Sequence, residues 1–312
     1  MIKVINDLEK LHIENRTAIA IGKFDGVHIG HRVLIDEIVK AHADGLLSVV
    51  FTFDPAPEVF FGFQSDEQLM TAEEKRCVLE SMGVDIIVEY PMNPVTAALE
   101  PERFISDILV ARMNAGLIAA GPDLSFGAGG KGDFDLLKAL SKQYGYETVK
   151  IDKVMRLGDA VSSTRIRDLI LSGKMEESTE LLGSPYTFKG VIRHGRQLGR
   201  TIGMPTANIV PEKGKLIPPF GVYFSKVVFE EDGSEKYGIS NIGVKPTVKD
   251  DTSVNIETYL YDTDGDLYGR EIQVSLIHFK RPERKFADVE ALKQAMHADT
   301  EEGRKYFKLH TC

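Results

Sequence analysis

Apolar positions follow two different rhythms along the chain. Up to about residue 184, apolar runs of strand length alternate with segments in which apolar residues recur every three or four positions, as on one face of a helix. Leu34, Ile38 and Ala41 follow this helical period between two apolar runs. The pattern predicts strands at residues 17–21, 47–53, 84–88, 116–120 and 147–154.

Helix signals occupy the segments between these runs. Thr71, with Glu74 three residues later, predicts a capping box, and Gly83 predicts the end of that helix. Residues 101–113 and 133–144 also have a helical pattern. Strands that alternate with helices form a parallel sheet with both faces covered, and ligands bind at the carboxyl ends of its strands. The predicted fold class of this half is α/β.

After Leu-Gly-Ser-Pro at residues 182–185 the pattern becomes that of short strands, so we place a domain boundary between residues 184 and 185. Short strands separated by turn signals predict a small antiparallel β-barrel. The strands and turns are expected at Gly221–Phe229, 253–260 and 271–279, and at Asp232-Gly233 and Asp264-Gly265. A helix over residues 288–308 closes the chain.

The charge balance narrows the class of partner. The 312 residues carry 38 Lys and Arg against 47 Asp and Glu, a formal net charge of −9. Generic binding of nucleic acid or of an anionic membrane needs a basic face, so we expect neither. A local basic pocket for a phosphorylated small molecule is compatible with this charge, and the sequence leaves a homo-oligomer open.

Cysteine usage and hydropathy predict a cytoplasmic protein. Cys77 and Cys312 are far apart and form neither a disulfide framework nor a thiolate metal site, which fits a reducing compartment. The N-terminus lacks the basic and apolar regions of a signal peptide. The longest clean apolar stretch near it, residues 46–53, is far too short to span a membrane. We therefore expect a soluble protein.

The first candidate site lies where the first predicted strand passes into the first predicted helix. Gly22, Gly26 and Gly30 allow a ligand to approach the backbone, and a helix N-terminus offers N–H groups to a phosphate. His28 and His31 share one helical face and can hold one group together. This arrangement suits attack on an α-phosphate, because fixed donors stabilise the charge that grows on the phosphoryl oxygens.

Two other interpretations of the histidine pair stay open on the residues alone. Histidines three residues apart are often only solvated, or satisfied by local hydrogen bonds near a turn. They can also chelate zinc, but no third ligand is evident in the sequence. The glycines and the position between strand and helix favour phosphate binding.

The run Gly22-x-Phe24-Asp25-Gly26-x-His28-x-Gly30-His31 resembles the HxGH motif of nucleotidylyltransferases, in the form found in bacterial bifunctional riboflavin kinase/FAD synthetases. Residues 161–167 resemble a second element of that family, a Ser/Thr-rich helix start that is followed by arginine. On its own such a segment is more often an ordinary capped helix with a solvated arginine. Its hydroxyl and N–H groups can bind an ATP phosphate, and Arg167 adds a permanent charge for the pyrophosphate. The resemblance implies a Rossmann-like nucleotidylyltransferase domain over residues 1–184, with nucleotide-binding roles for Ser162, Ser163 and Thr164.

Two further loops follow this family, with two departures from its pattern. Residues 121–127 resemble its loop on the adenosine or flavin side, with Asp123 at the polar position. Residues 51–57 resemble a loop that usually reads Pro-His-Pro, but Ala56 stands in place of the histidine. Lys23 stands where the family commonly has Asn. The alternative that follows is an enzyme in which Ala56 weakens adenylylation.

The second candidate site, residues 190–208, combines four glycines with three arginines. Such a stretch can form a flexible basic loop over nucleotide phosphates, with Gly195 and Gly199 among its glycines. Thr206 and Asn208 then offer oxygen ligands on one side of an extended segment, which suits Mg²⁺. No Gly-Lys-Ser/Thr ends the stretch, so it is not a Walker motif, and an ordinary surface loop is the alternative.

This stretch, which ends in Pro-Thr-Ala-Asn, closely resembles the riboflavin-kinase loop of the same family. Residues 221–223, 240–247 and 256–260 follow the family in the same order. The resemblance places the general base at Glu257, and strand alternation puts Glu257 on the face of Asn255 and Tyr259. A carboxylate there can accept the proton of a primary hydroxyl that attacks the γ-phosphate.

The resemblance implies a two-domain transferase that makes flavin cofactors. Residues 185–312 would phosphorylate riboflavin to FMN with Mg-ATP, and residues 1–184 would adenylylate FMN to FAD and release pyrophosphate. The catalytic roles would fall on His28, His31, Arg167 and Glu257. Two alternatives stay open: an enzyme with only one working activity, and a non-catalytic flavin-binding or regulatory protein.

Overall fold

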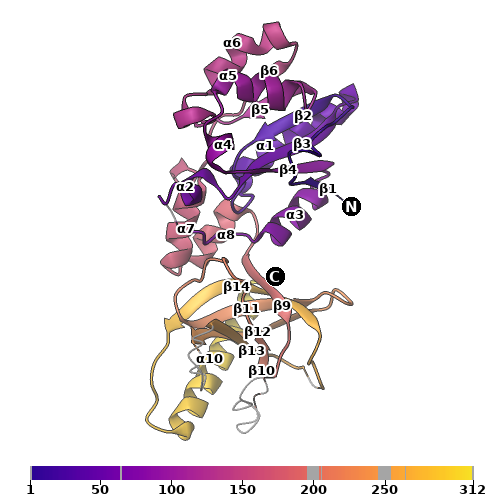
Figure 1. Ribbon diagram of the computed structural model, residues 1–312. Helices are drawn as coiled ribbons and strands as arrows, with labels where there is room; N and C mark the ends of the chain where they lie inside the picture. The colour runs from indigo at the N-terminus through magenta and orange to yellow at the C-terminus, as the bar shows by residue number, and fades with distance from the viewer. Residues whose placement is uncertain are drawn as a thin grey trace. The chain divides into compact units, whose positions relative to one another are not determined.

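The computed structural model describes residues 2–63, 65–194, 204, 206–244, 254–263 and 265–310. The chain forms two compact units, Met1–Ser163 and Thr164–Cys312 (Figure 1). Helix α8 (Met175–Leu182) and all but the first residue of α7 (Ser163–Leu171) belong to the second unit, where α8 packs against β9 and β14. The predicted boundary at residues 184 and 185 thus marks the end of the helical pattern and lies beyond the division of the compact units.

A six-stranded parallel sheet forms the first unit, in the order β1-β4-β3-β2-β5-β6. Every predicted strand is present within a few residues of its expected ends, so the α/β class is confirmed. The short strand β1 was not predicted, because three residues carry too little pattern. The strands are β1 (Lys3–Ile5), β2 (Thr17–Ile21), β3 (Leu47–Asp54), β4 (Ile86–Pro91), β5 (Ala115–Ala120) and β6 (Glu147–Lys150).

Helices connect these strands, and one of them differs from its prediction. The capping box is confirmed, since Thr71 Oγ1 accepts the N–H of Glu74, whose carboxylate accepts the N–H of Thr71. The helix predicted at residues 101–113 is divided: α5 passes at Phe104 into a π-helical segment, Phe104–Val110, which is largely buried. The helices are α1 (Ile29–Lys40), α2 (Pro57–Phe60), α3 (Ala72–Ser81), α4 (Pro94–Ala97), α5 (Pro101–Arg103) and α6 (Phe134–Tyr144). Short 3₁₀ turns (Ala41–Asp44, Ala128–Gly130) and a small hairpin of β7 (Met155–Arg156) and β8 (Asp159–Ala160) complete the unit.

Both faces of the parallel sheet are covered, as the pattern predicts. Along β2, Ile19 and Ile21 belong to the apolar cluster that the π-helical segment and α6 cover. Ala18 and Ala20 belong to the cluster that α1 and α3 cover. Successive side chains of a strand face opposite ways, so a strand that is buried on both sides is apolar throughout.

An antiparallel sheet forms the second unit, in the order β10-β13-β12-β11-β14-β9. Its edges meet, because Arg193, just after β9, forms a bridge with Asn208 of β10 in which the Arg193 N–H donates to the Asn208 carbonyl at 2.8 Å. The predicted antiparallel class of this half is confirmed. The strands are β9 (Tyr186–Val191), β10 (Thr206–Ile209), β11 (Gly221–Phe229), β12 (Glu235–Val244), β13 (Val254–Leu260) and β14 (Glu271–Pro282).

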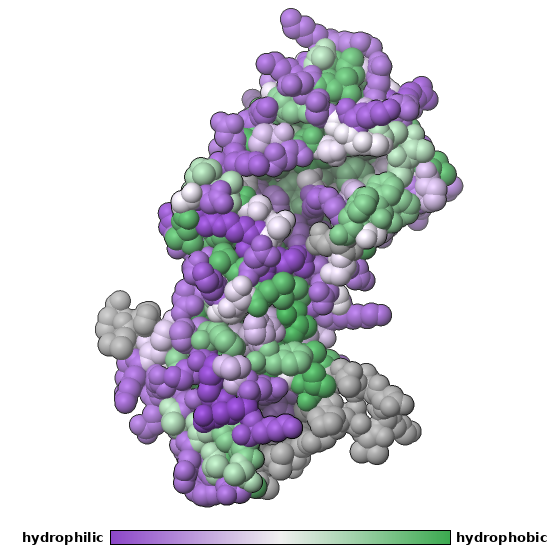
Figure 2. All heavy atoms as spheres, turned by 90° about the vertical axis from the view of Figure 1, so that its left-hand side faces the viewer, coloured by the Kyte–Doolittle hydropathy of each residue, from purple (hydrophilic) through white to green (hydrophobic). Residues whose placement is uncertain are grey.

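The first predicted turn and the last helix of this unit agree with the prediction, whereas Asp264 of the predicted turn Asp264-Gly265 lies outside the described residues. Asp232-Gly233 joins β11 to β12, with Gly233 at a φ of +66°. Helix α10 (Val289–His310) follows the last strand and packs through Phe307 on Val222 and Phe224 of the sheet. On the face drawn in Figure 2, hydrophilic residues are spread over both units with apolar groups between them.

Candidate active sites

The motif of residues 22–31 lies where the order of the parallel sheet reverses. Strand β2 ends at Ile21, and α1 begins at Ile29. From β2 the chain adds β3 and β4 on one side, whereas β5 and β6 lie on the other. In open parallel sheets, ligands bind outside the carboxyl ends of the strands at such a switch point. The first predicted site therefore has the position that its fold class favours.

The loop between β2 and α1 is held in an unusual backbone conformation. Phe24, Gly26 and Val27 have φ values of +52°, +83° and +37°, a region that residues other than glycine rarely adopt. The side chains of Phe24 and Val27 are fully buried in the cluster that contains Leu34. This burial offsets a strain of about 1–3 kcal/mol per residue and keeps the loop in one shape.

His28 and His31 form a stacked pair at the start of α1. His28 is the N-cap, and its Nδ1 accepts the backbone N–H of His31 at 3.2 Å. The two ring centroids are 3.6 Å apart, with an interplanar angle of 13°. A Cβ on Gly30 would lie 3.3 Å from the His28 ring, so this glycine makes room for the imidazole. Because Nδ1 of His28 accepts a hydrogen bond, its Nε2 carries the proton and is a donor.

Both imidazoles are neutral near pH 7. Burial lowers the pKa of His28 to about 4, since desolvation disfavours the charged ring. Burial also lowers the pKa of His31, and the ammonium groups of Lys75 and Lys23 lower it further, as does His28 when it is protonated. The pair can therefore donate hydrogen bonds to a phosphate, but it adds no positive charge of its own.

The Ser-Ser-Thr segment begins beside this loop. The Ser163 hydroxyl donates to the Asp25 carbonyl at 2.9 Å, and the Asp25 carboxylate accepts the N–H of Leu69 at 2.7 Å. The structure thus brings the predicted residues Asp25 and Ser163 together. Ser162 and Thr164 are exposed. Arg167 is half-buried on α7 in the second unit, and its role at the histidines stays a prediction.

The remaining predicted features of the first site have partners within the protein. Asp123 is exposed in the turn after β5, and its carboxylate lies 2.6 Å from Lys153 Nζ. A Cβ on Gly22 would lie 3.1 Å from the Phe24 ring, so Gly22 accommodates a side chain of the loop itself. The Lys23 ammonium is paired with Glu58, on the short helix α2 whose N-cap is Ala56.

Lys75 is a buried charged residue whose ammonium acts electrostatically on His31, and it was not predicted. It lies on α3, and its side chain is buried. A lysine in an amphipathic helix is normally solvent-exposed, so nothing in the local pattern marks this one. Only the packing of α3 against the sheet buries it.

A row of polar residues across the antiparallel sheet forms the second candidate site. Asn208 of β10 pairs in register with Glu257 of β13, and Glu257 pairs with Asn241 of β12. Paired residues of neighbouring strands lie on the same face, so the three side chains are adjacent. Ile256 and Thr258, which flank Glu257, are buried on the opposite face, as strand alternation predicts.

Thr206 and Asn208 lie together at one end of this row. Nδ2 of Asn208 donates to Thr206 Oγ1 at 3.2 Å and to the Thr206 carbonyl at 3.1 Å. Nδ2 of Asn255 donates to Asn208 Oδ1 at 3.1 Å. A hydroxyl oxygen and an amide oxygen beside the Glu257 carboxylate form a donor set that fits Mg²⁺ together with nucleotide phosphates. In the described part of the chain, no cluster of three or more His, Cys, Asp or Glu residues could hold a metal instead.

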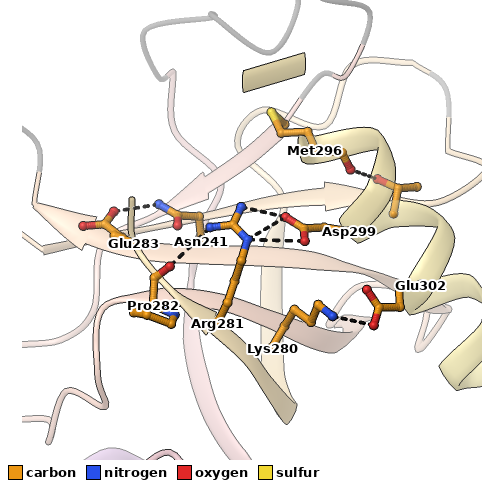
Figure 3. A network of polar contacts seen from close by, with 9 residues as sticks. Asn241, Lys280, Arg281, Pro282, Glu283, Met296, Asp299 and Glu302 are labelled. Atoms are coloured by element: carbon orange, nitrogen blue, oxygen red, sulfur yellow. Dashed lines mark hydrogen bonds and ion pairs between the residues drawn. The ribbon is translucent and has the colours of Figure 1, made fainter. Parts of the chain in front are cut away.

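A network of charged residues continues this row onto β14 and α10 (Figure 3). The Arg281 guanidinium donates to the Asp299 carboxylate of α10 at 2.7 Å. Asn241 Nδ2 donates to Glu283 Oε1 at 3.1 Å. Arg281 and Asp299 were not predicted, because their pairing joins two elements that only the fold places together.

Gly195 and Gly199 of the predicted basic loop lie outside the described residues, as do Pro205 and residues 245–253. The phosphate-binding role of this loop stays a prediction.

Comparison with known proteins identifies both halves. The family described as FAD synthetase matches residues 10–165, and the family described as riboflavin kinase matches residues 182–307. The fold and these matches define an ATP-dependent transferase that acts on flavins.

Two full-length relatives carry the same pair of activities in their name. The bifunctional riboflavin kinase/FMN adenylyltransferase of Listeria monocytogenes is 38% identical over 292 residues, which cover 92% of this chain and 91% of that protein. The protein of the same name from Escherichia coli K12 is 36% identical over 311 residues, which cover 99% and 98%. The chain therefore belongs to the bifunctional riboflavin kinase/FMN adenylyltransferase family, an enzyme family of flavin cofactor biosynthesis whose substrates include ATP, riboflavin and FMN.

A solved structure shares the whole fold under a different name. The macrolide-efflux protein from Streptococcus pneumoniae superposes with a TM-score of 0.85 at 29% identity, over 96% of this chain and 98% of that one. Among the helices described for the present chain, none has the length and apolar character that crossing a bilayer requires.

Proposed function

We propose that the chain makes FAD from riboflavin in two ATP-dependent steps at two separate sites. The C-terminal site phosphorylates the 5′-hydroxyl of riboflavin, and the N-terminal site joins AMP to the phosphate of FMN. The observation that carries this proposal is that each matched half has its own group of polar residues suited to a nucleotide phosphate. The first half has neutral, stacked histidines at the switch point, and the second has the row from Asn208 to Glu257.

In the adenylylation step, a phosphate oxygen of FMN attacks the α-phosphorus of ATP, and the bond to pyrophosphate breaks. His28 and His31 donate hydrogen bonds to the α-phosphate oxygens, on which charge grows in the transition state. Arg167 stabilises the leaving pyrophosphate, and Asp123 lies on the adenosine or flavin side. The residues that shape the loop and bind the nucleotide are Gly22, Phe24, Asp25, Gly26, Gly30, Ser162, Ser163 and Thr164.

In the kinase step, Glu257 accepts the proton of the riboflavin hydroxyl that attacks the γ-phosphorus, while the bond from that phosphorus to ADP breaks and ADP leaves. Thr206 and Asn208 would hold Mg²⁺, and this ion would neutralise charge on the nucleotide phosphates. The basic loop with Gly195 and Gly199 covers those phosphates. The hydrogen bonds among Thr206, Asn208 and Asn255 support this assignment, because they orient the two oxygen donors.

We further propose that residues 1–184 and 185–312 hold the two activities, which the family matches at 10–165 and 182–307 support. The net charge of −9 supports small-molecule substrates rather than nucleic acid as partners. Cys77, a free and exposed thiol, supports a reducing, cytoplasmic environment.

Chromatographic separation of flavins after incubation with ATP and Mg²⁺ tests the proposal. From riboflavin we expect FMN first and FAD afterwards, and from FMN we expect FAD directly. If the riboflavin incubation gave FMN but neither incubation gave FAD, only the kinase would be active. Ala56, which stands where the family usually has histidine, would then be the residue to replace. No conversion by the folded protein would contradict both assignments.

A further inference from the structure

The histidine site needs a positive charge that its two imidazoles do not supply. Adenylylation concentrates negative charge on the phosphoryl oxygens of ATP, and such charge is stabilised by preorganised donors and cations. His28 and His31 are buried and neutral, and the Lys23 ammonium is paired with Glu58. Arg167 is assigned to the leaving pyrophosphate rather than to the α-phosphate.

Helix α3 carries a buried lysine to the edge of this site. The Asp25 carboxylate binds the N–H of Leu69, two residues before the N-cap Thr71, so the start of α3 is held against the histidine loop. Lys75 lies one turn into the helix, where its N–H donates to the Thr71 carbonyl at 3.0 Å. Leu79, one turn later on the same face, belongs to the cluster that contains Phe24 of the loop.

The charge of Lys75 is buried without a bonded partner. Lys75 is 9% exposed, and among the described residues no carboxylate lies within ion-pair distance of its ammonium. The nearby Glu89 is occupied by Arg76, through bonds of 2.9 and 2.6 Å from Nε and Nη2. An ammonium removed from water without a partner costs several kcal/mol, so a fold that keeps one there has a use for it.

The charge of Lys75 acts on one of the two histidines. The charge of Lys75 is one of the causes that lower the pKa of His31. Burial lowers the pKa of Lys75 itself, while the carboxylates of Asp25, Glu89 and Asp54 oppose that change and Arg76 adds to it. A bound polyphosphate would favour the charged form of Lys75 further, since opposite charge stabilises an ammonium.

We propose that Lys75 is a catalytic residue of adenylylation, whose ammonium binds an ATP phosphate oxygen at the histidine pair and supplies the positive charge that the neutral imidazoles lack. The inference rests on the proposed function of the first site. As FMN attacks, the electron pair of the broken phosphorus–oxygen bond passes to the leaving pyrophosphate. Lys75 keeps its proton throughout and stabilises the charge electrostatically.

The full-length variants Lys75→Met, Lys75→Gln and Lys75→Arg test this role, with Lys40→Met as the matched control on an exposed lysine. We expect FAD formation from FMN and ATP to fall about 100-fold in kcat in Lys75→Met, with riboflavin phosphorylation within twofold of wild type. Unchanged phosphorylation shows that the second unit is folded, and urea unfolding of the same preparation reports on the first unit. The pKa of His31, followed by NMR, should rise when the lysine charge is removed, and a merely structural lysine with no charge near the histidines would not move it.

If the first unit does not fold in Lys75→Met, the variants Lys75→Arg and Lys75→Gln still test the proposal. Both carry long polar side chains and differ in charge, so we expect the arginine variant to make FAD at least tenfold faster than the glutamine variant. Equal rates in these two, or FAD formation within threefold of wild type in a folded Lys75→Met, would overturn the proposal. His28→Asn separates it from the site assignment: if His28→Asn keeps its FAD formation while Lys75→Met loses it, the histidine assignment falls and Lys75 stands.

Discussion

His28 serves the fold and the site with different atoms. Its Nδ1 caps α1 by accepting the N–H of His31, while its Nε2 is a donor for the substrate. Burial of the ring at this position lowers its pKa to about 4 in the folded protein, against about 6.5 in an unfolded chain. The unfolded state therefore binds the proton more readily between these values, and stability is lost as the pH falls from about 6.5 to about 4.

His28→Asn tests both functions of this residue. Asparagine is a good N-cap but does not titrate, so we expect stability near pH 7 to change by no more than about 1 kcal/mol. The loss of unfolding free energy between pH 6.5 and 4 should be smaller than in wild type by about 3 kcal/mol. Urea unfolding at a series of pH values measures this difference. FAD formation should fall about 100-fold, and an unchanged acid sensitivity would contradict the buried, neutral state of His28.

Glu257→Gln tests the base of the kinase site. The amide fills the same space beside Asn208 and Asn241 but cannot accept the hydroxyl proton, so we expect FMN formation to fall by about 10²–10⁴-fold. FAD formation from added FMN should stay within twofold of wild type. Chromatography of the flavins measures both rates, and the loss of both activities would refute two separate sites.

At the scale of elements, helices hold the polar residues of each site in place. Helix α3 begins at a capping box two residues after Leu69, whose N–H donates to Asp25 of the histidine loop, and the helix carries Lys75 inward. Helix α10 lies on the face of the antiparallel sheet that carries the row with Glu257, and the pair of Arg281 and Asp299 joins it to β14 (Figure 3). The geometry of each site thus depends on how a helix docks on a sheet.

Asp299→Ala tests the docking of α10. Removal of one partner of a largely buried ion pair leaves the Arg281 guanidinium without its carboxylate, and we expect the second unit to lose about 3 kcal/mol of unfolding free energy. Asp262→Ala is the matched control, because Asp262 pairs with Arg304 of the same helix on the surface. Its loss should change stability little. Urea unfolding compares the two variants, and equal effects would show that the buried pair does not hold the helix.

At the scale of the whole molecule, two compact units each contain one site, and FMN is the product of one reaction and the substrate of the other. The boundary between the units falls after Ser163, the first residue of α7, while the match to the FAD synthetase family ends at residue 165. The Ser-Ser-Thr-Arg segment therefore spans the division: Ser163 binds the Asp25 carbonyl within the first unit, and Arg167 lies in the second.

A mixture of two inactive variants tests whether FMN moves between molecules. His28→Asn should make FMN but not FAD, and Glu257→Gln should make FAD only from supplied FMN. Because each variant keeps one of the two sites unchanged, we expect the mixture to convert riboflavin to FAD when neither variant does so alone. Chromatography of the flavins measures the result. FMN that accumulates without FAD would mean that the product must pass between sites of one molecule.

Several features of this protein could be predicted because they depend on residues close together in the chain. Periods of two and of three to four residues distinguish strands from helices, so the α/β half and the β half follow from the apolar pattern. The capping box at Thr71, the stacked pair of His28 and His31, and the face of Glu257 follow from fixed spacings in a helix or strand. The family was identifiable because its motifs are local sequences.

Tertiary structure alone decided the features that depend on distant neighbours. Lys75 is a site residue only because α3 packs on the sheet and buries its charge, and Arg281 meets Asp299 only because α10 docks on β14. The neutral state of the histidines likewise follows from burial, which no spacing along the chain contains. The sequence by itself determined which elements form and which motifs they carry, because these depend on local periodicity. Packing decided which charges are buried and paired, because desolvation and ion pairing depend on groups that the fold brings together.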